Sequence, residues 1–207
     1  MSDYINIWKE YVDNNGTRYL SSLYDRYSRI IFVDTETTGF NCLKGDQLVQ
    51  LSAIAYDTNV DKYLIMDRYV SLFKMNEMPE DVSKINGITT DFLSEHGISE
   101  KDVINEFKIL CMSKTSKDNG VTFEDSKTLV IAYNAHFDLN FLQEACKRIS
   151  NDNFLASCDF LDPLTVYRDR HEFPHRLENA IDNYGLSDYV KNSHNSMDDV
   201  IYMKKKL

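Results

Sequence analysis

Three short apolar runs decide most of what this chain can fold into. They lie at residues 29–35 (RIIFVDT), 128–133 (TLVIAY) and 153–158 (NFLASC). Continuous apolar runs of this length are typical of strands that are buried on both faces of a sheet. Helical patterns separate the second run from the third and follow the third, and strands that alternate with helices pair in parallel. The second half of the chain is therefore expected to build parallel strands.

Two further strands are expected between the first and second runs. Residues 47–57 and 63–73 alternate apolar with polar side chains, and the turn-like sequence DTN follows the first of them. With residues 29–35 they predict an antiparallel meander. Apolar spacings of three and four residues predict helices at 79–86, 99–111, 137–149, 163–170, 175–184 and 196–207. The expected fold class is α/β, a mixed sheet in which parallel strands follow the meander, flanked by helices.

Two segments fall outside this pattern. Residues 1–28 carry apolar residues at helical spacing on either side of Asn14-Asn15-Gly16, which predicts two short amphipathic helices. They would either cap the sheet or dock on a partner. Residues 113–127 (SKTSKDNGVTFEDSK) are polar and are expected to form a surface loop. We therefore expect an N-terminal helical extension at 1–28 and one domain at 29–207.

Composition excludes several classes of protein. The chain has 207 residues, of which 43% are hydrophobic and 12% aromatic, a balance that suits a globular domain and argues against disorder. No apolar run is long enough to span a bilayer, and the N-terminus lacks the pattern of a secretory signal. The four cysteines are widely scattered and form no zinc or disulfide pattern. We expect a cytoplasmic protein with reduced thiols and no membrane partner.

The net charge of −10 bears directly on function. An acidic chain lacks the basic footprint of a general nucleic-acid-binding protein. A metal-dependent nuclease is compatible with it, because such a site gathers carboxylates and bound divalent ions invert the local charge. The positions of the acids therefore matter more than their number.

Four acids stand where strands end or helices begin. Asp34 and Glu36 are two residues apart at the end of the first run, so on an extended chain they point to the same side and repel each other unless a cation bridges them. Asp138 lies in the first turn of the expected helix at 137–149. Asp199 lies in the first turn of the last helix, five residues after His194. Each residue taken alone is better explained as an ordinary solvated or helix-capping side chain.

Taken together and in order, these segments resemble the three motifs of the DEDDh family of 3′–5′ exonucleases, the family of the proofreading epsilon subunit of bacterial DNA polymerase III. VDTETTGF resembles the first motif, NAHFDLNFL the second and HNSMDDV the third. The intervening segments QLVQLSAIAY, INGIT, LDPLTVYR and RLENAIDNYG also agree. The resemblance covers about residues 29–207, and it implies a ribonuclease-H-like fold. The third motif departs from its common pattern at Ser196, two positions after the histidine, where a small residue is common.

The resemblance also implies a metal site and its ligands. The family's four metal-site carboxylates fall on Asp34, Glu36, Asp138 and Asp199, and its general base falls on His194. Two divalent ions, Mg²⁺ or Mn²⁺, suit hard oxygen ligands. Asp34 is expected to bridge the ions, with Glu36 and Asp199 completing one of them and Asp138 supporting the cluster.

Substrate contacts are implied by the loop that follows the first motif. Its backbone is expected to hold the terminal nucleotide, and Phe40 either stacks on a base or folds back on the core. The candidate substrate-binding residues are Thr35, Thr37, Thr38, Gly39, Phe40 and Asn134, the last of which is also a structural brace for the loop before Asp138.

The expected function is that of a 3′–5′ exonuclease acting on single-stranded or frayed DNA ends, in proofreading or repair. The alternatives are an exoribonuclease of the same fold and a non-catalytic domain that binds nucleic acid or a polymerase. The expected partners are a nucleic-acid 3′ end and a DNA polymerase or another replication or repair protein.

Overall fold

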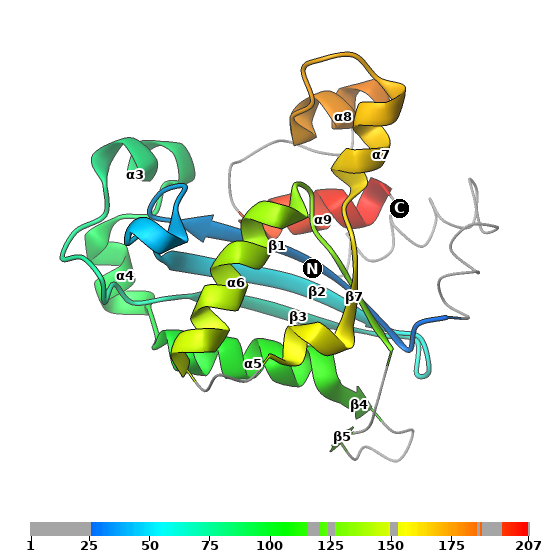
Figure 1. Ribbon diagram of the computed structural model, residues 1–207, viewed down its shortest axis with the longest axis horizontal. Coiled ribbons are helices and arrows are strands. Elements are labelled where there is room, and N and C mark those ends of the chain that lie inside the picture. The colour runs from blue at the N-terminus through cyan, green and yellow to red at the C-terminus, as the bar shows by residue number, and fades with distance from the viewer. Residues whose placement is uncertain are drawn as a thin grey trace.

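The sheet at the centre of the molecule has five strands in the order β3-β2-β1-β6-β7 (Figure 1). The computed structural model describes residues 26–115, 121–123, 127–149, 153–185, 187 and 196–206. The strands of this sheet are β1 (Arg29–Thr37), β2 (Leu48–Asp57), β3 (Lys62–Tyr69), β6 (Thr128–Ile131) and β7 (Cys158–Leu161). The helices are η1 (Cys42–Lys44), α3 (Glu80–Asn86), α4 (Thr90–His96), α5 (Glu100–Met112), α6 (Ala135–Ile149), η2 (Phe154–Ser157), α7 (Pro163–Arg170), α8 (Leu177–Asn183) and α9 (Ser196–Lys206).

Strand pairing confirms the expected mixed sheet. β1, β2 and β3 form an antiparallel meander, and β6 and β7 add to the other side of β1 in parallel. β1 is therefore the central strand and touches both halves of the sheet. This topology is the one that the alternation of strand and helix patterns predicts.

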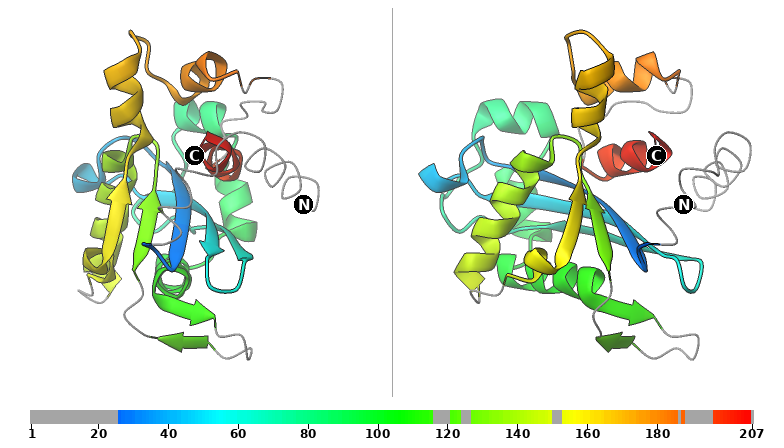
Figure 2. Two further views of the ribbon diagram at one scale, coloured as in Figure 1. Left: turned by 90° about the vertical axis from the view of Figure 1, so that its right-hand side faces the viewer. Right: turned by 45° about the vertical axis from the view of Figure 1, so that its right-hand side comes forward.

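The two faces of the sheet are covered by different helices (Figure 2). Ile31 and Val33 of β1 pack in a core cluster with apolar residues of α5 and α6. Ile30 and Phe32 pack on the opposite face with Val200 and Met203 of α9. Because side chains alternate along a strand, the face of any further residue of β1 follows from its number.

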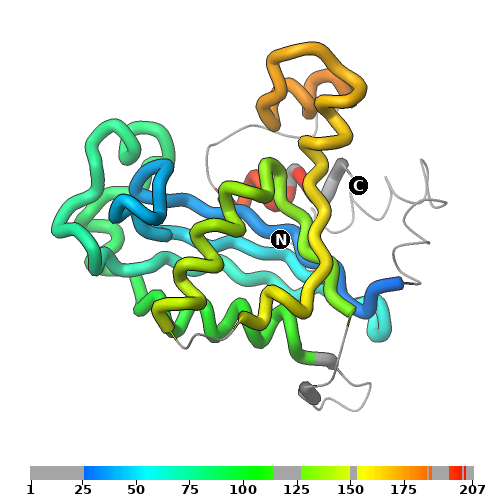
Figure 3. The backbone as a smooth tube through the Cα atoms, in the orientation of Figure 1, coloured from blue at the N-terminus to red at the C-terminus, as the bar shows by residue number. Residues whose placement is uncertain are grey.

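Side chains cap the beginnings of two of the predicted helices. The Ser99 hydroxyl accepts a hydrogen bond from the Asp102 amide at the start of α5. The Asp162 carboxylate accepts one from the Leu164 amide at the start of α7, where Pro163 lacks an amide hydrogen. α7 and α8 then project beyond the end of the sheet (Figure 3).

Several expected boundaries were wrong. The third apolar run is the short helix η2 followed by β7, so the strand lies at Cys158–Leu161 and not at 153–158. β3 ends at Tyr69, and Val70 makes only an isolated bridge to Ile98. The segment after α5 contains a two-stranded ribbon, β4 (Ser113–Thr115) with β5 (Val121–Phe123), where a loop was expected. α4 was not predicted.

Part of the sequence-based prediction lies outside the described residues. This holds for residues 1–25, which make up most of the predicted N-terminal extension, and for His194. No helix within the described ranges is long and apolar enough to cross a membrane.

A buried ion pair joins the meander to the α5 layer at the end of the sheet where β1 begins. Arg29 is 1% exposed and donates from Nη2 to Asp57 Oδ2 at 2.7 Å. Its Nη1 donates to the Leu110 carbonyl oxygen at 2.7 Å and to Ser113 Oγ at 3.1 Å. Removing one partner of such a pair leaves a buried charge without compensation.

Asp57→Ala is therefore expected to lower the free energy of unfolding by about 3–5 kcal/mol. Glu106→Ala is the matched control, because Glu106 pairs with Arg68 at 2.8 Å with both side chains more than 40% exposed. Such an exposed pair contributes about 0–1 kcal/mol. Urea denaturation followed by circular dichroism measures both variants, and equal losses of stability would contradict this account.

Candidate active site

The C-terminal part of β1 extends past its parallel neighbour. β6 pairs only with Arg29 to Phe32, whereas β1 continues to Thr37 beside β2. Asp34 and Glu36 lie in this extension on the α9 face, in line with Ile30 and Phe32. Both carboxylates are partly exposed, as expected from their two-residue spacing. The end of β6 thus leaves room beside Asp34 for the start of α6.

α6 brings Asp138 to this opening. Asp138 lies in the first turn of the helix and is only 2% exposed. Thr35 points to the α6 face, opposite to Asp34, and its hydroxyl donates to Asp138 Oδ1 at 2.7 Å. Thr35, which lies between Asp34 and Glu36 in the strand, therefore fixes the position of Asp138.

Asp162 and Asn134 hold the turn that begins α6. The Asp162 carboxylate accepts hydrogen bonds from the amides of Asn134 at 3.0 Å and Ala135 at 3.1 Å. Asn134 has a φ of 65°, a left-handed conformation that asparagine adopts more readily than most residues. This geometry agrees with the expected bracing of the loop before Asp138.

α9 places Asp199 beside the same cluster. Asp199 lies in the first turn of α9, and the next residue, Val200, is completely buried against the sheet. The carboxylates of Asp199, Asp138 and Glu36 all act on Asp34. The four acids that the sequence motifs single out are thus brought together from β1, α6 and α9.

Burial and mutual repulsion control the protonation of this cluster. Burial first, and then the neighbouring carboxylates, raise the pKa of Asp34 well above its usual range. Burial and the charge of Asp199 raise the pKa of Glu36 to about 7. Burial likewise raises the pKa of Asp138 to about 7, against the opposing hydrogen bond from Thr35. The arrangement costs free energy at neutral pH unless positive charge is added.

The chemistry of these donors fits hard divalent cations. All four side chains are carboxylates, the ligands that Mg²⁺ and Mn²⁺ prefer over zinc. Within the described ranges, no three acidic, histidine or cysteine side chains form a set already gathered closely enough to hold a metal ion. Repulsion between ionised carboxylates opposes a closer approach, and a divalent cation between them would offset it.

Asn86 is a contact of the cluster that sequence analysis missed. It is 8% exposed at the end of α3, and its Nδ2 lies 3.5 Å from Glu36 Oε2. This contact lowers the pKa of Glu36 against the effect of burial. The INGIT segment that contains Asn86 agrees with the family pattern. A lone asparagine in a turn, however, does not indicate from sequence that its side chain contacts Glu36.

The loop after β1 uses its threonine side chains internally. Thr37 Oγ1 donates to the Gly39 carbonyl oxygen at 2.6 Å, and Thr38 Oγ1 accepts from the Gln47 amide at 3.0 Å. A Cβ at Gly39 would lie 2.5 Å from the Asp46 carboxylate, so a side chain here would displace that carboxylate. These contacts fix the path of the loop up to Phe40.

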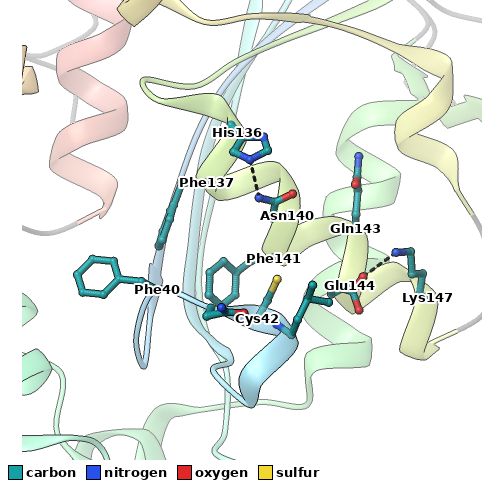
Figure 4. Close-up of a pocket in the computed structure, with 11 residues that line it drawn as sticks. Phe40, Cys42, His136, Phe137, Asn140, Phe141, Gln143, Glu144 and Lys147 are labelled. Carbon is teal, nitrogen blue, oxygen red and sulfur yellow. Dashed lines mark hydrogen bonds and ion pairs between the residues drawn. The ribbon is translucent and has the colours of Figure 1, made fainter.

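A cleft of about 430 Å³ lies between this loop and α6 (Figure 4). Phe40 stands at its edge, is 87% exposed and meets Phe137 edge-to-face at 6.4 Å. Phe141 continues the aromatic row at 5.2 Å from Phe137. Asn41 of the loop also lines the cleft, and α6 contributes the polar side chains of His136, Asn140, Gln143, Glu144 and Lys147.

Comparison with known proteins identifies the family of this chain. The sequence profile of the RNase T family, described as exonuclease, matches residues 31–206. Ribonuclease T of Yersinia enterocolitica is 28% identical over 143 residues, which are 67% of this chain and 63% of that protein. DNA polymerase III subunit epsilon of Buchnera aphidicola is 30% identical over 173 residues, which are 80% of this chain and 65% of that protein. The matches thus span less than two thirds of either relative.

A solved structure shares the fold. Exonuclease I of E. coli, in complex with a dA16 oligonucleotide, superposes with a TM-score of 0.65 at 20% identity. The superposition covers 86% of this chain and 40% of exonuclease I. The five-stranded mixed sheet with its helices is therefore the ribonuclease-H-like exonuclease fold. Because the family profile spans nearly all of residues 29–207, the chain belongs to the RNase T family of DEDDh 3′–5′ exonucleases, whose members use divalent metal ions.

Proposed function

We propose that this chain removes nucleotides from the 3′ ends of single-stranded or frayed DNA, with two Mg²⁺ or Mn²⁺ ions held by Asp34, Glu36, Asp138 and Asp199. The observation that carries the proposal is the cluster itself, in which burial and then three other carboxylates raise the pKa of Asp34. A domain that only binds nucleic acid gains nothing from such a concentration of negative charge, because phosphates are repelled by it.

Each carboxylate has a place in the proposed site. Asp34 is central, since the other three acids all act on it, and it would contact both ions. Glu36 and Asp199 would complete one ion, and Asp138 would support the cluster from the position that Thr35 fixes. When bound, the cations supply an acidified water and neutralise charge on the attacking and leaving oxygens.

His194 is proposed as the general base. An imidazole with an ordinary pKa near 6.5 accepts a proton from the attacking water at neutral pH. The proposal rests on sequence, since His194 stands five residues before Asp199 in the third motif. Retention of this histidine together with all four acids supports catalysis over a degenerate binding domain.

Phe40 is proposed to stack on a base near the 3′ end. Its ring is exposed at the edge of the cleft beside the first motif, where Thr37 and Thr38 hold the loop in place. Stacking on a phenylalanine tolerates any base, which suits an exonuclease without sequence preference. The Asn134 side chain, exposed at the start of α6, is a further proposed substrate contact.

The second candidate substrate is RNA. The similarity to ribonuclease T favours it, and the similarity to subunit epsilon of DNA polymerase III favours DNA and a polymerase partner in proofreading or repair. Nothing in the motifs selects for or against a ribose 2′-hydroxyl. Digestion of 5′-labelled DNA and RNA of one sequence decides between the two candidates.

Asp34→Asn, Glu36→Gln, Asp138→Asn and Asp199→Asn are each expected to slow the shortening of a 5′-labelled strand at least a hundredfold. Each change removes a charge that holds the cations while it keeps the shape of the side chain. Glu106→Gln, at an exposed glutamate of α5, is the control and should retain full activity. Unchanged activity in Asp34→Asn with intact circular dichroism would refute the site.

Stability should depend on pH in a way that divalent ions reverse. Glu36 and Asp138 have ordinary pKa values of 4.5 and 3.8 and values of about 7 in the folded chain. Between about pH 4 and 7 the folded chain thus holds protons that the unfolded chain has lost, and stability falls as the pH rises through this window. With a chelator, the Tm should fall from pH 5 to 7.5, and Glu36→Gln should flatten that fall. Mn²⁺ should raise the Tm more at pH 7.5 than at pH 5, and an equal increase at both values would contradict the account.

Phe40→Ala is expected to raise KM for single-stranded DNA by roughly 5- to 100-fold, which corresponds to about 1–3 kcal/mol of stacking, with a smaller change in kcat. Phe173→Ala is the matched control, because Phe173 is 86% exposed but lies between α7 and α8. Initial rates over a range of strand concentrations give both constants. A KM equal to that of Phe173→Ala would show that Phe40 takes no part in binding.

A further inference from the structure

A chain of hydrogen-bonded polar side chains lies next to the carboxylates on the α9 face of the sheet. Asp34 pairs with Ser52 of β2, and Ser52 pairs with Asp67 of β3, so the three side chains form one row across the sheet. The neighbouring row, formed by Phe32, Ile54 and Ile65, is apolar. The change from apolar to polar residues therefore occurs at the row that contains Asp34.

Ser52 is the centre of this polar chain. It is completely buried, and its hydroxyl donates to Asp67 Oδ1 at 2.8 Å. The same oxygen accepts from Gln50 Nε2 at 2.8 Å. Ser52 Oγ also lies 2.5 Å from the hydroxyl of Ser196, the first residue of α9. The strands β2 and β3 and the helix α9 thus meet at Ser52.

The direction of these hydrogen bonds follows from the number of protons. A serine hydroxyl has one proton to donate, and the Asp67 oxygen can only accept. Since the Ser52 proton goes to Asp67, the proton between the two serines belongs to Ser196, and Ser52 accepts it. Asp67 therefore orients Ser52 as an acceptor for the beginning of α9.

Asp199 follows Ser196 by one turn of the same helix, and Val200 and Met203 of this helix pack on the apolar part of the sheet. Apolar packing is not directional and permits small sliding and rotation, whereas a buried hydrogen bond fixes both distance and direction. The Ser52–Ser196 hydrogen bond therefore fixes the first turn of α9 on β2, the strand beside Asp34.

We propose that Ser52, oriented by Asp67, is a positioning residue that sets the distance of Asp199 from Asp34 and Glu36 through its hydrogen bond to Ser196. The proposal rests on the metal site of the proposed function. The Ser52–Ser196 hydrogen bond also explains why the third motif departs from the family pattern at Ser196. A side chain without a hydroxyl at this position could not form a hydrogen bond to Ser52.

The test measures Mn²⁺ binding directly, by electron paramagnetic resonance of the free ion, and global stability by urea denaturation. Ser52→Ala and Ser196→Ala should each weaken Mn²⁺ binding about tenfold, in the range known for residues that orient metal ligands. The double variant should bind Mn²⁺ no more weakly than either single variant, because both substitutions remove the same hydrogen bond. Asp67→Ala should weaken binding similarly, and Asp67→Asn should restore it, since the amide oxygen still accepts from Ser52.

Ser113→Ala is the matched control. Ser113 is a buried serine whose hydroxyl accepts from Arg29, far along the sheet from Asp34. Ser113→Ala should lower the free energy of unfolding without any change in Mn²⁺ binding. Wild-type binding of Mn²⁺ by Ser52→Ala, or an additive double variant, would overturn the positioning role while leaving the exonuclease site intact. If the wild-type protein binds no Mn²⁺ and cuts no strand, the proposed function itself fails.

Discussion

Repulsion among four carboxylates is the interaction on which the rest of the structure depends. Asp34, Glu36, Asp138 and Asp199 act on one another at positions where water screens them poorly. Such a cluster is unfavourable in a folded chain without cations, so the scaffold must hold it against its own charge. The core on both faces of β1 supplies this support, with α5 and α6 on one side and α9 on the other.

The support is specific as well as apolar. Each acid outside β1 is tied to the sheet through a hydroxyl group, Asp138 directly by Thr35 and the helix of Asp199 by the serine pair. The start of α6 is further fixed by Asp162, which serves two helix beginnings with one carboxylate. These contacts restrict the positions of the proposed ligands before a cation binds, which would lower the cost of ordering them.

Much of this could be predicted from sequence, for physical reasons. The two-residue spacing of Asp34 and Glu36 at the end of an expected strand placed them on one face, and the apolar runs of β1 and β6 marked buried strands. Asp138 and Asp199 followed from helix beginnings. The shift of β7 from 153–158 to Cys158–Leu161 escaped prediction because a short apolar run suits a buried 3₁₀ turn as well as a strand.

The contacts that escaped prediction join residues far apart in sequence. Asn86 reaches Glu36 across 50 positions, and Ser196 reaches Ser52 across 144. No sequence pattern predicts the hydrogen-bond partner of either residue, because a serine or asparagine can form a hydrogen bond with any polar group that the fold brings near. Ser52 reads as a small polar residue in an alternating strand, and only the sheet register aligns it with Asp34.

The most direct test of the central claim is a crystal of the protein soaked in Mn²⁺ and measured for anomalous scattering. The account predicts two peaks roughly 3.5–4 Å apart, both in contact with Asp34 and enclosed by Glu36, Asp138 and Asp199. Peaks elsewhere on the molecule, or none at these carboxylates at an Mn²⁺ concentration that supports strand cleavage, would contradict it.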